Sequence, residues 1–224
     1  MKLPCPDSRL QVAIERLAVP GVMIGYRLIS PGDECALLSE EALDLSDPKT
    51  SRARGAARIV ARELLSLAEC AVPNGPSGAP IWPRGIVGSL AHNSDVAVAA
   101  VALQREFTSI GIDIEPAEAL PPEVVKTIAT PREQLSLNAY VYGGRLLFVA
   151  KEAVFKAVAD LDQIFLDHHD VEVDFTKHEA VVRNGRTVEL RSCISTHLLA
   201  LAFVRRVRPV QRKSGTGTKS GLIG

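Results

Sequence analysis

Apolar and polar positions alternate strictly in one short stretch near the middle of the chain. Residues 109–116 read S-I-G-I-D-I-E-P, so that every second position is isoleucine. A period of two is typical of a strand, and it places the isoleucines on one face and Asp113 and Glu115 on the other. Two neighbouring carboxylates repel each other. The pattern therefore indicates either a divalent cation held by carboxylate oxygens or an edge strand with a solvated acidic face.

Other apolar runs of strand length occur on both sides of this stretch. Turn-forming residues separate them, including Asn184 and Gly185 at a predicted hairpin. The part of the chain after residue 170 accordingly predicts a meander of strands. The predicted strands cover residues 21–29, 96–103, 171–175, 180–183, 186–190 and 197–204.

Helical periodicity is clear between Lys49 and Leu67. Alanines and larger apolar residues form one side, whereas the positions from Lys49 to Arg62 hold five basic residues and no acidic one. Arg54, Arg58 and Arg62 recur every four residues and form one stripe. Like charges in a row destabilise a helix, and a phosphate-bearing ligand or an acidic partner would offset this. The alternative is a solvated face of an amphipathic helix.

Residues 146–158 predict a second long helix, L-L-F-V-A-K-E-A-V-F-K-A-V, in which helix-forming residues accompany an apolar face. Glu152 and Lys156 are four positions apart and therefore neighbours on the helix surface. They form either an ordinary surface ion pair or a third carboxylate for a metal, with a lysine one turn on that reaches a phosphate. Shorter helices are predicted at residues 39–45 and 123–129.

A loop rich in proline and glycine, residues 72–88, contains Trp82, the single tryptophan, and leads to His92. His92 stands where this loop meets the buried strand at residues 96–103, a place where a side chain can be held rigidly towards a ligand. The alternative for a lone histidine is a hydrogen-bonded structural role.

Composition limits the class of protein. The 224 residues are 46% hydrophobic with a formal net charge of zero, which suits one large domain or two small ones. No apolar run approaches the roughly 20 residues that cross a bilayer, and the four cysteines are scattered, which favours a reduced, cytoplasmic protein. Residues 212–224 are basic and rich in glycine and serine, and we expect a disordered tail rather than a nucleic-acid-binding segment.

Several motifs occur in a recognisable order: W-P-x-G-I-V-G-S-L-x-H at residues 82–92, G-I-D-I-E-P at 111–116 and A-K-E-A-V-F-K-A at 150–157. With the arginine-bearing helix before them, they resemble the 4'-phosphopantetheinyl transferases of the monomeric class that activates enterobactin and surfactin synthetases. The resemblance implies a pseudo-dimeric α/β (α+β) fold, two similar halves with the active site between them. We expect an N-terminal half at residues 1–104 and a C-terminal half at 105–211.

The family's reaction, as the resemblance implies it, moves the 4'-phosphopantetheine group of coenzyme A onto a serine of an acyl or peptidyl carrier protein. Mg²⁺ is required and adenosine 3',5'-bisphosphate is released. By motif, Asp113, Glu115 and Glu152 would hold the metal, and Glu152, Lys156 and His92 would take part in catalysis, with Glu152 or a metal-bound water as the base. The residues implied to contact coenzyme A are Arg52, Arg54, Arg58, Ser89, His92 and Lys156.

The class of relatives points to carrier proteins of siderophore, nonribosomal peptide or polyketide assembly, and to a cytoplasmic monomer that binds neither nucleic acid nor membrane. Two alternatives stay open. The first is a degenerate relative that binds coenzyme A without transferring it, which Ser77 and Ala91 favour because basic and hydroxyl residues are usual there. The second is another Mg²⁺-dependent phosphoesterase, which would not need residues 82–92.

Overall fold

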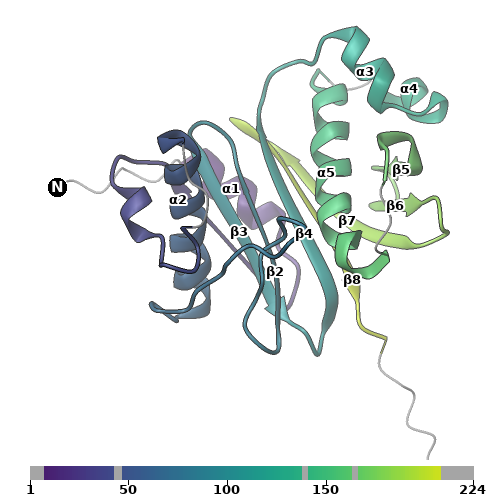
Figure 1. Ribbon diagram of the computed structural model, residues 1–224. Helices are drawn as coiled ribbons and strands as arrows, with labels where there is room; N and C mark the ends of the chain where they lie inside the picture. The colour runs from purple at the N-terminus through teal and green to yellow at the C-terminus, as the bar shows by residue number, and fades with distance from the viewer. Residues whose placement is uncertain (1–7, 43–46, 138–140, 163–165, 208–224) are drawn as a thin grey trace, which may run out of the picture.

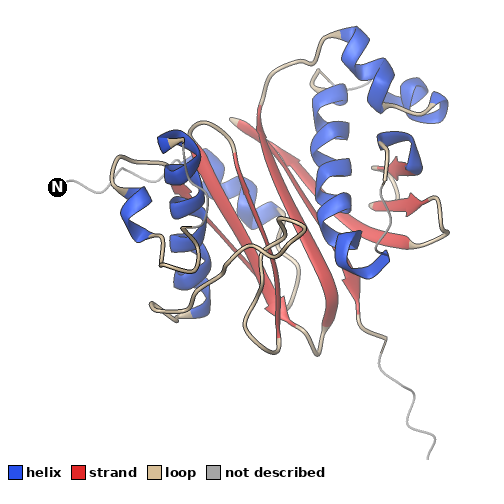
Figure 2. Cartoon of the chain, viewed as in Figure 1, coloured by secondary structure: helices blue, strands red, loops and turns tan. Residues whose placement is uncertain are grey.

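Two antiparallel sheets, each carrying one long helix, make up the computed structural model of the chain (Figures 1 and 2). The structure describes residues 8–42, 47–137, 141–162 and 166–207. One sheet has the strand order β1-β3-β2 and the other has the order β4-β8-β7-β6-β5. The mixture of helix and sheet agrees with the predicted α/β class. The elements are α1 (Ser8–Arg16), β1 (Val22–Leu28), η1 (Asp33–Ala36), α2 (Pro48–Leu65), β2 (Ile86–His92), β3 (Val96–Leu103), β4 (Phe107–Pro116), α3 (Pro122–Ile128), α4 (Pro131–Leu137), α5 (Gly143–Asp162), η2 (His168–Asp170), β5 (Val171–Asp174), β6 (Glu179–Val182), β7 (Thr187–Ile194) and β8 (His197–Arg205).

Small residues let helix α2 lie close to the first sheet. Strand β3, V-A-V-A-A-V-A-L, is buried over all but its last residue, and β1 and β2 pair with it on either side. Ala56 and Ala57 of the helix pack against Ala97, and Val60 packs against Ala99. Since alanine side chains are short, the helix axis approaches the strands closely, and this brings the first turn of α2 near the end of β2.

Helix α5 covers the second sheet through its contacts with β4 and β8 (Figure 1). The buried face of α5 carries Leu147, Ala150, Val154 and other small or branched residues that join the core of this half. Gly111 of β4 lies directly under the helix, and a Cβ atom there would collide with the Ala153 carbonyl oxygen. Glycine at this position therefore allows the backbones of β4 and α5 to meet.

The other face of β4 joins the two sheets. Ile110, Ile112 and Ile114 are buried in one cluster with residues of α1, β3 and β8, including Leu10 and Val98. The predicted alternation is thus confirmed, because the isoleucines point into this core while Asp113 points to α5, where it meets Lys156. The apolar core between the sheets holds β2 and β4 at a fixed distance from each other.

Most predicted elements match the structure to within a few residues, with one clear error. Residues 39–41 form a turn rather than the start of a helix, and residues 43–46 lie outside the described residues, as does the predicted tail at 212–224. Residues 104–106 connect β3 of the first sheet to β4 of the second; the domain division at 104/105 itself stays a prediction. None of the helices in the described part of the chain has the length and hydropathy needed to span a lipid bilayer.

Candidate active site

Asp113 and Lys156 form the centre of the candidate site. Asp113, on β4, is 8% exposed, and its Oδ1 atom accepts a hydrogen bond of 2.6 Å from the Lys156 ammonium on α5. Lys156 Nζ also lies 3.2 Å from the Ile112 carbonyl oxygen. Burial raises the pKa of Asp113, and the neighbouring Lys156 opposes this shift. A carboxylate and an ammonium are therefore held together at the junction of strand and helix.

Glu115 follows two residues later on the same face of the strand and has a different partner. The Arg145 guanidinium, at the start of α5, donates to Glu115 Oε2 at 3.1 Å and to the Glu118 carbonyl oxygen at 3.2 Å. Burial and the charge of Asp113 raise the pKa of Glu115, whereas Arg145 lowers it. The two strand carboxylates thus repel each other, and each is held by its own cation.

Glu152 lies on α5 one turn before Lys156. Within the described residues, its ion-pair partner is a histidine rather than that lysine. Its Oε1 atom lies 3.4 Å from His168 Nε2, at the start of η2. Burial raises the pKa of Glu152, and the charge of Asp113 raises it further. The structure therefore brings Glu152 into the electrostatic neighbourhood of Asp113 and Lys156.

The three carboxylates predicted as metal ligands are gathered in one region without converging on one point. No group of three histidine, cysteine, aspartate or glutamate side chains is arranged to hold a metal ion within the described residues. Each carboxylate instead contacts a nitrogen of a different side chain. The donor chemistry suits a hard cation, since carboxylate oxygens are its preferred ligands. Burial and then the charge of Asp113 raise the pKa of both Glu115 and Glu152.

The first sheet contributes His92 and Ser89 to the same region. Ser89 is buried, and its hydroxyl oxygen accepts a 3.0 Å hydrogen bond from the Ile112 backbone N–H, which ties β2 to β4. His92 ends β2 and is exposed. Partial desolvation lowers the pKa of His92, and the positive charges of Lys156 and Arg54 lower it further. His92 on the first sheet thus lies within electrostatic reach of Lys156 on α5, whereas the charge of Asp113 acts on His92 in the opposite direction.

A cavity of about 420 Å³ lies beside His92 and the first turn of α2. Its wall includes Lys49 and Arg52, and Arg52 Nε also donates to Glu34 Oε2 at 3.2 Å. The Asp47 carboxylate caps the helix by accepting from the Lys49 and Thr50 N–H groups. Since Asp47 occupies these backbone donors, an anion in this cavity would be bound by the basic side chains. Lys49 had no role assigned from the sequence, although the basic run that contains it was a signal.

The arginine stripe of α2 is largely buried rather than solvated or open to a ligand. Arg58 is 2% exposed and donates to the Val72 carbonyl and to Asn74 Oδ1. Arg62 donates to both oxygens of Glu41, at 2.8 and 3.0 Å. The acidic partner is therefore Glu41, from the segment predicted as a helix. These surroundings do not favour the predicted role of Arg58 in binding a phosphate, because its donors face into the protein.

A second cavity, of about 900 Å³, runs from the proline- and glycine-rich loop to Lys156. It is lined by Trp82, Ser89 and Phe155, among other residues of β2, β4 and α5. The Trp82 ring lies against Gly88, where a Cβ atom would collide with it. The loop before β2 therefore forms a mainly apolar wall next to the Asp113–Lys156 pair.

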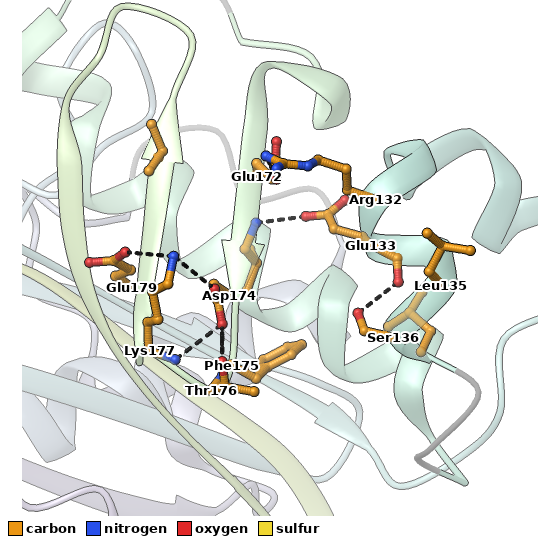
Figure 3. A pocket seen from close by; sticks show the side chains of 13 residues that line it. Arg132, Glu133, Leu135, Ser136, Glu172, Asp174, Phe175, Thr176, Lys177 and Glu179 are labelled. Atoms are coloured by element: carbon orange, nitrogen blue, oxygen red, sulfur yellow. Dashed lines mark hydrogen bonds and ion pairs between the residues drawn. The ribbon is translucent and has the colours of Figure 1, made fainter.

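A third cavity, of about 740 Å³, lies away from these groups, between α4 and the β5–β6 hairpin (Figure 3). Its charged side chains pair with one another: Arg132 with Glu172, and Lys177 with Asp174 and Glu179. None of the site residues predicted from the sequence lines it. We assign it no role.

Sequence reasoning missed the internal support of the site. The Lys151 side chain is fully buried, and its ammonium donates to the Ile128 carbonyl, to Glu133 Oε2 and to the His168 carbonyl at 2.6–2.8 Å. Lys151 thus fastens α3, α4 and η2 to α5, next to Glu152. Because these partners are distant in sequence, helical periodicity alone gave no signal for this arrangement.

Comparison with known proteins identifies the family. The family model described as the 4'-phosphopantetheinyl transferase N-terminal domain matches residues 40–102, and that of the 4'-phosphopantetheinyl transferase superfamily matches residues 109–203. The 4'-phosphopantetheinyl transferase Npt of Nocardia iowensis is 36% identical over 180 residues, or 77% of this chain and 81% of the relative. Svp of Streptomyces mobaraensis is 37% identical over 158 residues, 64% of this chain and 63% of the relative. Enterobactin synthase component D of Salmonella typhimurium is 37% identical over 87 residues, 36% of each chain.

Proposed function

Because this chain belongs to the 4'-phosphopantetheinyl transferase superfamily, we propose that it transfers the 4'-phosphopantetheine group of coenzyme A to a serine of an apo carrier protein. In this reaction the serine oxygen forms a bond to the phosphorus that bears pantetheine. The bond from that phosphorus to the oxygen bridging the pyrophosphate breaks, and adenosine 3',5'-bisphosphate leaves. The serine proton passes to a base on the enzyme.

The observation that best supports this proposal is the Asp113–Lys156 pair at the junction of the two sheets, which lies near enough to His92 for both charges to act on the imidazole. Asp113 and Lys156 come from β4 and α5, at 2.6 Å, and His92 comes from β2. Pyrophosphate cleavage requires positive and hydrogen-bonding groups where charge develops on the leaving phosphate. Lys156 supplies such a group beside the larger cavity, and His92 supplies one beside the smaller cavity.

Lys156 is the residue proposed to stabilise the departing phosphate. Its side chain is 32% exposed, although it is bound to Asp113, so a phosphate oxygen can approach it. A lysine ammonium has three donors, and the contacts to Asp113 Oδ1 and to the Ile112 carbonyl use two of them. The third N–H has no acceptor within the described part of the chain and can donate to a phosphate oxygen.

Glu152 is proposed to accept the serine proton. Burial and the charge of Asp113 both raise its pKa, so that it takes up a proton more readily than an exposed glutamate would. It lies on the same helix as Lys156, one turn away. The base and the group that stabilises the leaving phosphate are thus fixed by a single rigid element.

Asp113, Glu115 and Glu152 would hold a magnesium ion, which supplies positive charge to the pyrophosphate when it is bound. Their donor chemistry and the effect of the Asp113 charge on the two glutamates support this assignment. Lys156 and Arg145 now satisfy the two strand carboxylates. We therefore expect these two side chains to shift their hydrogen bonds when the cation binds.

The basic cavity beside His92 is the proposed site for the phosphate groups of the nucleotide. Lys49, Arg52 and His92 line it, and the charge of Arg54 acts on His92. Arg52 and Arg54 were predicted from the sequence to bind these phosphates, and we keep that proposal. The cavity lining adds Lys49 to the set. Arg58 is left out because its guanidinium is buried against Val72 and Asn74.

Carrier proteins of nonribosomal peptide or polyketide assembly, including siderophore synthesis, are the proposed partners. The names of the matching relatives, which include enterobactin synthase component D, support this choice. We further propose that the chain acts as a monomer whose two halves are the two similar units of a pseudo-dimeric fold. A cytoplasmic location remains a prediction from the scattered cysteines.

The test is intact mass spectrometry of a panel of apo carrier proteins incubated with coenzyme A, Mg²⁺ and this protein. We expect one carrier serine to gain the mass of one phosphopantetheine group, with no gain when Asp113→Ala replaces the wild type or when a chelator removes the metal. Coenzyme A binding without modification of any carrier would instead identify a degenerate binding protein. Turnover of coenzyme A without a carrier would identify a phosphoesterase.

A further inference from the structure

His168 lies against the predicted base and had no role assigned from the sequence. Its ring stacks on Phe148, with centroids 5.7 Å apart and planes inclined by 21°, and it meets the Phe155 ring edge-on at 5.2 Å. Phe148, Glu152 and Phe155 are four and three residues apart on α5, and such residues share one helix face. The two aromatic rings therefore hold the imidazole over the Glu152 carboxylate.

The backbone of His168 is held as firmly as its ring. Its carbonyl oxygen accepts a 2.6 Å hydrogen bond from Lys151, whose ammonium is also bound to Glu133 at 2.8 Å. Asp167 and Asp170 form a reciprocal capping box around the η2 turn. The position of the ring is thus determined by contacts from α5, α4 and η2 together.

The polar edge of the ring points to Glu152. The Nε2 atom is buried and makes no hydrogen bond within the described part of the chain, yet Glu152 Oε1 lies 3.4 Å away. A neutral imidazole carries one N–H, on either Nδ1 or Nε2, and an N–H on Nε2 would face the Glu152 carboxylate. A buried N–H without an acceptor is unfavourable. A small rotation of the Glu152 side chain would supply the acceptor.

We propose that His168 is a positioning residue for Glu152, holding one carboxylate oxygen through Nε2 so that the other oxygen is presented to the reaction. This inference rests on the proposed function, because it specifies how one residue of that site is oriented. Groups that orient a reacting or metal-binding carboxylate typically change activity or metal affinity by about 10–100-fold when they are removed. A phenylalanine would fill the aromatic pocket equally well, so only the polar edge requires histidine.

The experiment compares His168→Phe, which keeps the ring packing and removes the donor, with His168→Gln, which extends an N–H to a similar position. The exposed neighbour His169→Gln is the matched control. Two measurements are made: Mn²⁺ binding to the protein alone by electron paramagnetic resonance, and kcat for transfer to a carrier. We expect His168→Phe to lower the Mn²⁺ affinity and kcat by about 10-fold each, with the KM for coenzyme A unchanged. His168→Gln should restore most of the loss, and His169→Gln should have no effect.

The same replacement in a Glu152→Gln background separates positioning from a general structural role. If His168 acts through Glu152, His168→Phe should cause no further loss of Mn²⁺ affinity in that background. An equal loss in both backgrounds, no loss in either, or failure of His168→Gln to restore binding would overturn the proposal. If the phenylalanine variant does not fold, His168→Asn replaces it, since asparagine reaches only the Nδ1 position and should lose function where glutamine keeps it.

Failure of the proposed function gives a different result. In that case the wild type modifies no carrier protein, while the Mn²⁺ measurements still report whether His168 and Glu152 are coupled. Transfer activity that is normal in His168→Phe, with normal Mn²⁺ affinity, would leave the function standing and reject the positioning role.

Discussion

Helices α2 and α5 each lie on one sheet, pack through alanines and carry buried cations, yet they neutralise those cations differently. On α2, Arg58 and Arg62 are both directed to Glu41, with Arg62 at 2.8 Å and Arg58 at 3.7 Å. On α5, Lys151 is buried against Glu133, but Lys156 reaches outward to Asp113 on β4 and remains partly exposed.

The difference shows that periodicity alone does not decide whether a charged side chain on a helix is structural or functional. The residue that packs against it in the folded protein decides this. The shared carboxylate partner of Arg58 and Arg62, Glu41, is itself buried, so we infer that this ion-pair network is structural. Asp113 is a buried carboxylate whose pKa is raised by burial, and it sits beside two further acids. Shifted pKa values in a group of neighbouring acids are typical of an active site. The following predictions test whether the buried cations of α2 are structural and the cation facing Asp113 on α5 is functional.

The largest expected effect is the loss of Glu41. Glu41→Gln should lower the free energy of unfolding by about 3–5 kcal/mol, because it leaves two buried guanidinium groups without a counter-charge. Urea denaturation measures this, with the exposed Glu63→Gln on the same helix as control. A loss below about 1 kcal/mol, the range of an exposed ion pair, would mean that the α2 network is not structural.

Replacing Asp113 should affect catalysis more than folding. Asp113→Asn should lower kcat/KM by a factor of hundreds, or about 3–4 kcal/mol of transition-state stabilisation. Thermal unfolding should show no loss of stability at neutral pH, since the ionised carboxylate is disfavoured in its buried site. A variant that loses stability and activity together would place Asp113 with Glu41 as a structural residue.

The contact between β4 and α5 should be sensitive to one methyl group. Gly111→Ala brings a Cβ against the Ala153 carbonyl oxygen, and overpacking of this kind costs about 1–3 kcal/mol. Transfer activity should fall as well, because the shift separates Asp113 from Lys156. Gly75→Ala, where a Cβ would meet only ordinary contacts at 3.5 Å or more, is the control. Equal behaviour of the two variants would contradict the close approach of strand and helix.

The partly exposed Arg52 of α2 should contribute to substrate binding alone. Arg52→Ala should raise the KM for coenzyme A about tenfold, equivalent to about 1.4 kcal/mol, and leave kcat nearly unchanged. High salt should reduce the difference, because exposed charges are screened. The control is Arg105→Ala, whose exposed side chain pairs with Glu106 away from the cavity. A fall in kcat with KM unchanged would contradict a purely binding role.

The smallest expected effect concerns the start of α2. Hydrogen bonds from the Thr50 side chain and then from backbone N–H groups lower the pKa of Asp47. Its ionised form therefore stabilises the folded protein above the unfolded pKa of about 4, and this contribution is lost as the pH falls through the lower folded value. Asp47→Asn keeps a cap but not the charge. The difference in melting temperature from wild type should shrink towards about pH 2; a difference that is independent of pH would contradict this.

The sequence by itself determined which faces exist and which side chains share them. The period of two at residues 109–116 placed Asp113 and Glu115 on one side of β4, and the period of four placed Arg54, Arg58 and Arg62 on one stripe of α2. The ordered motifs also led to the family that the comparisons support. These features are local, since backbone geometry alone relates residues two or four positions apart.

Only the tertiary structure decided which partner each side chain has. Glu41 lies 21 residues before Arg62, Glu133 lies 18 before Lys151, and Asp113 lies 43 before Lys156. Helical periodicity predicts the direction in which a side chain points, but the segment that packs there follows from the burial of apolar surface over the whole chain. For this reason the sequence did not predict that Arg58 is buried, that Lys151 connects α5 to its neighbours, or that His168 lies beside Glu152.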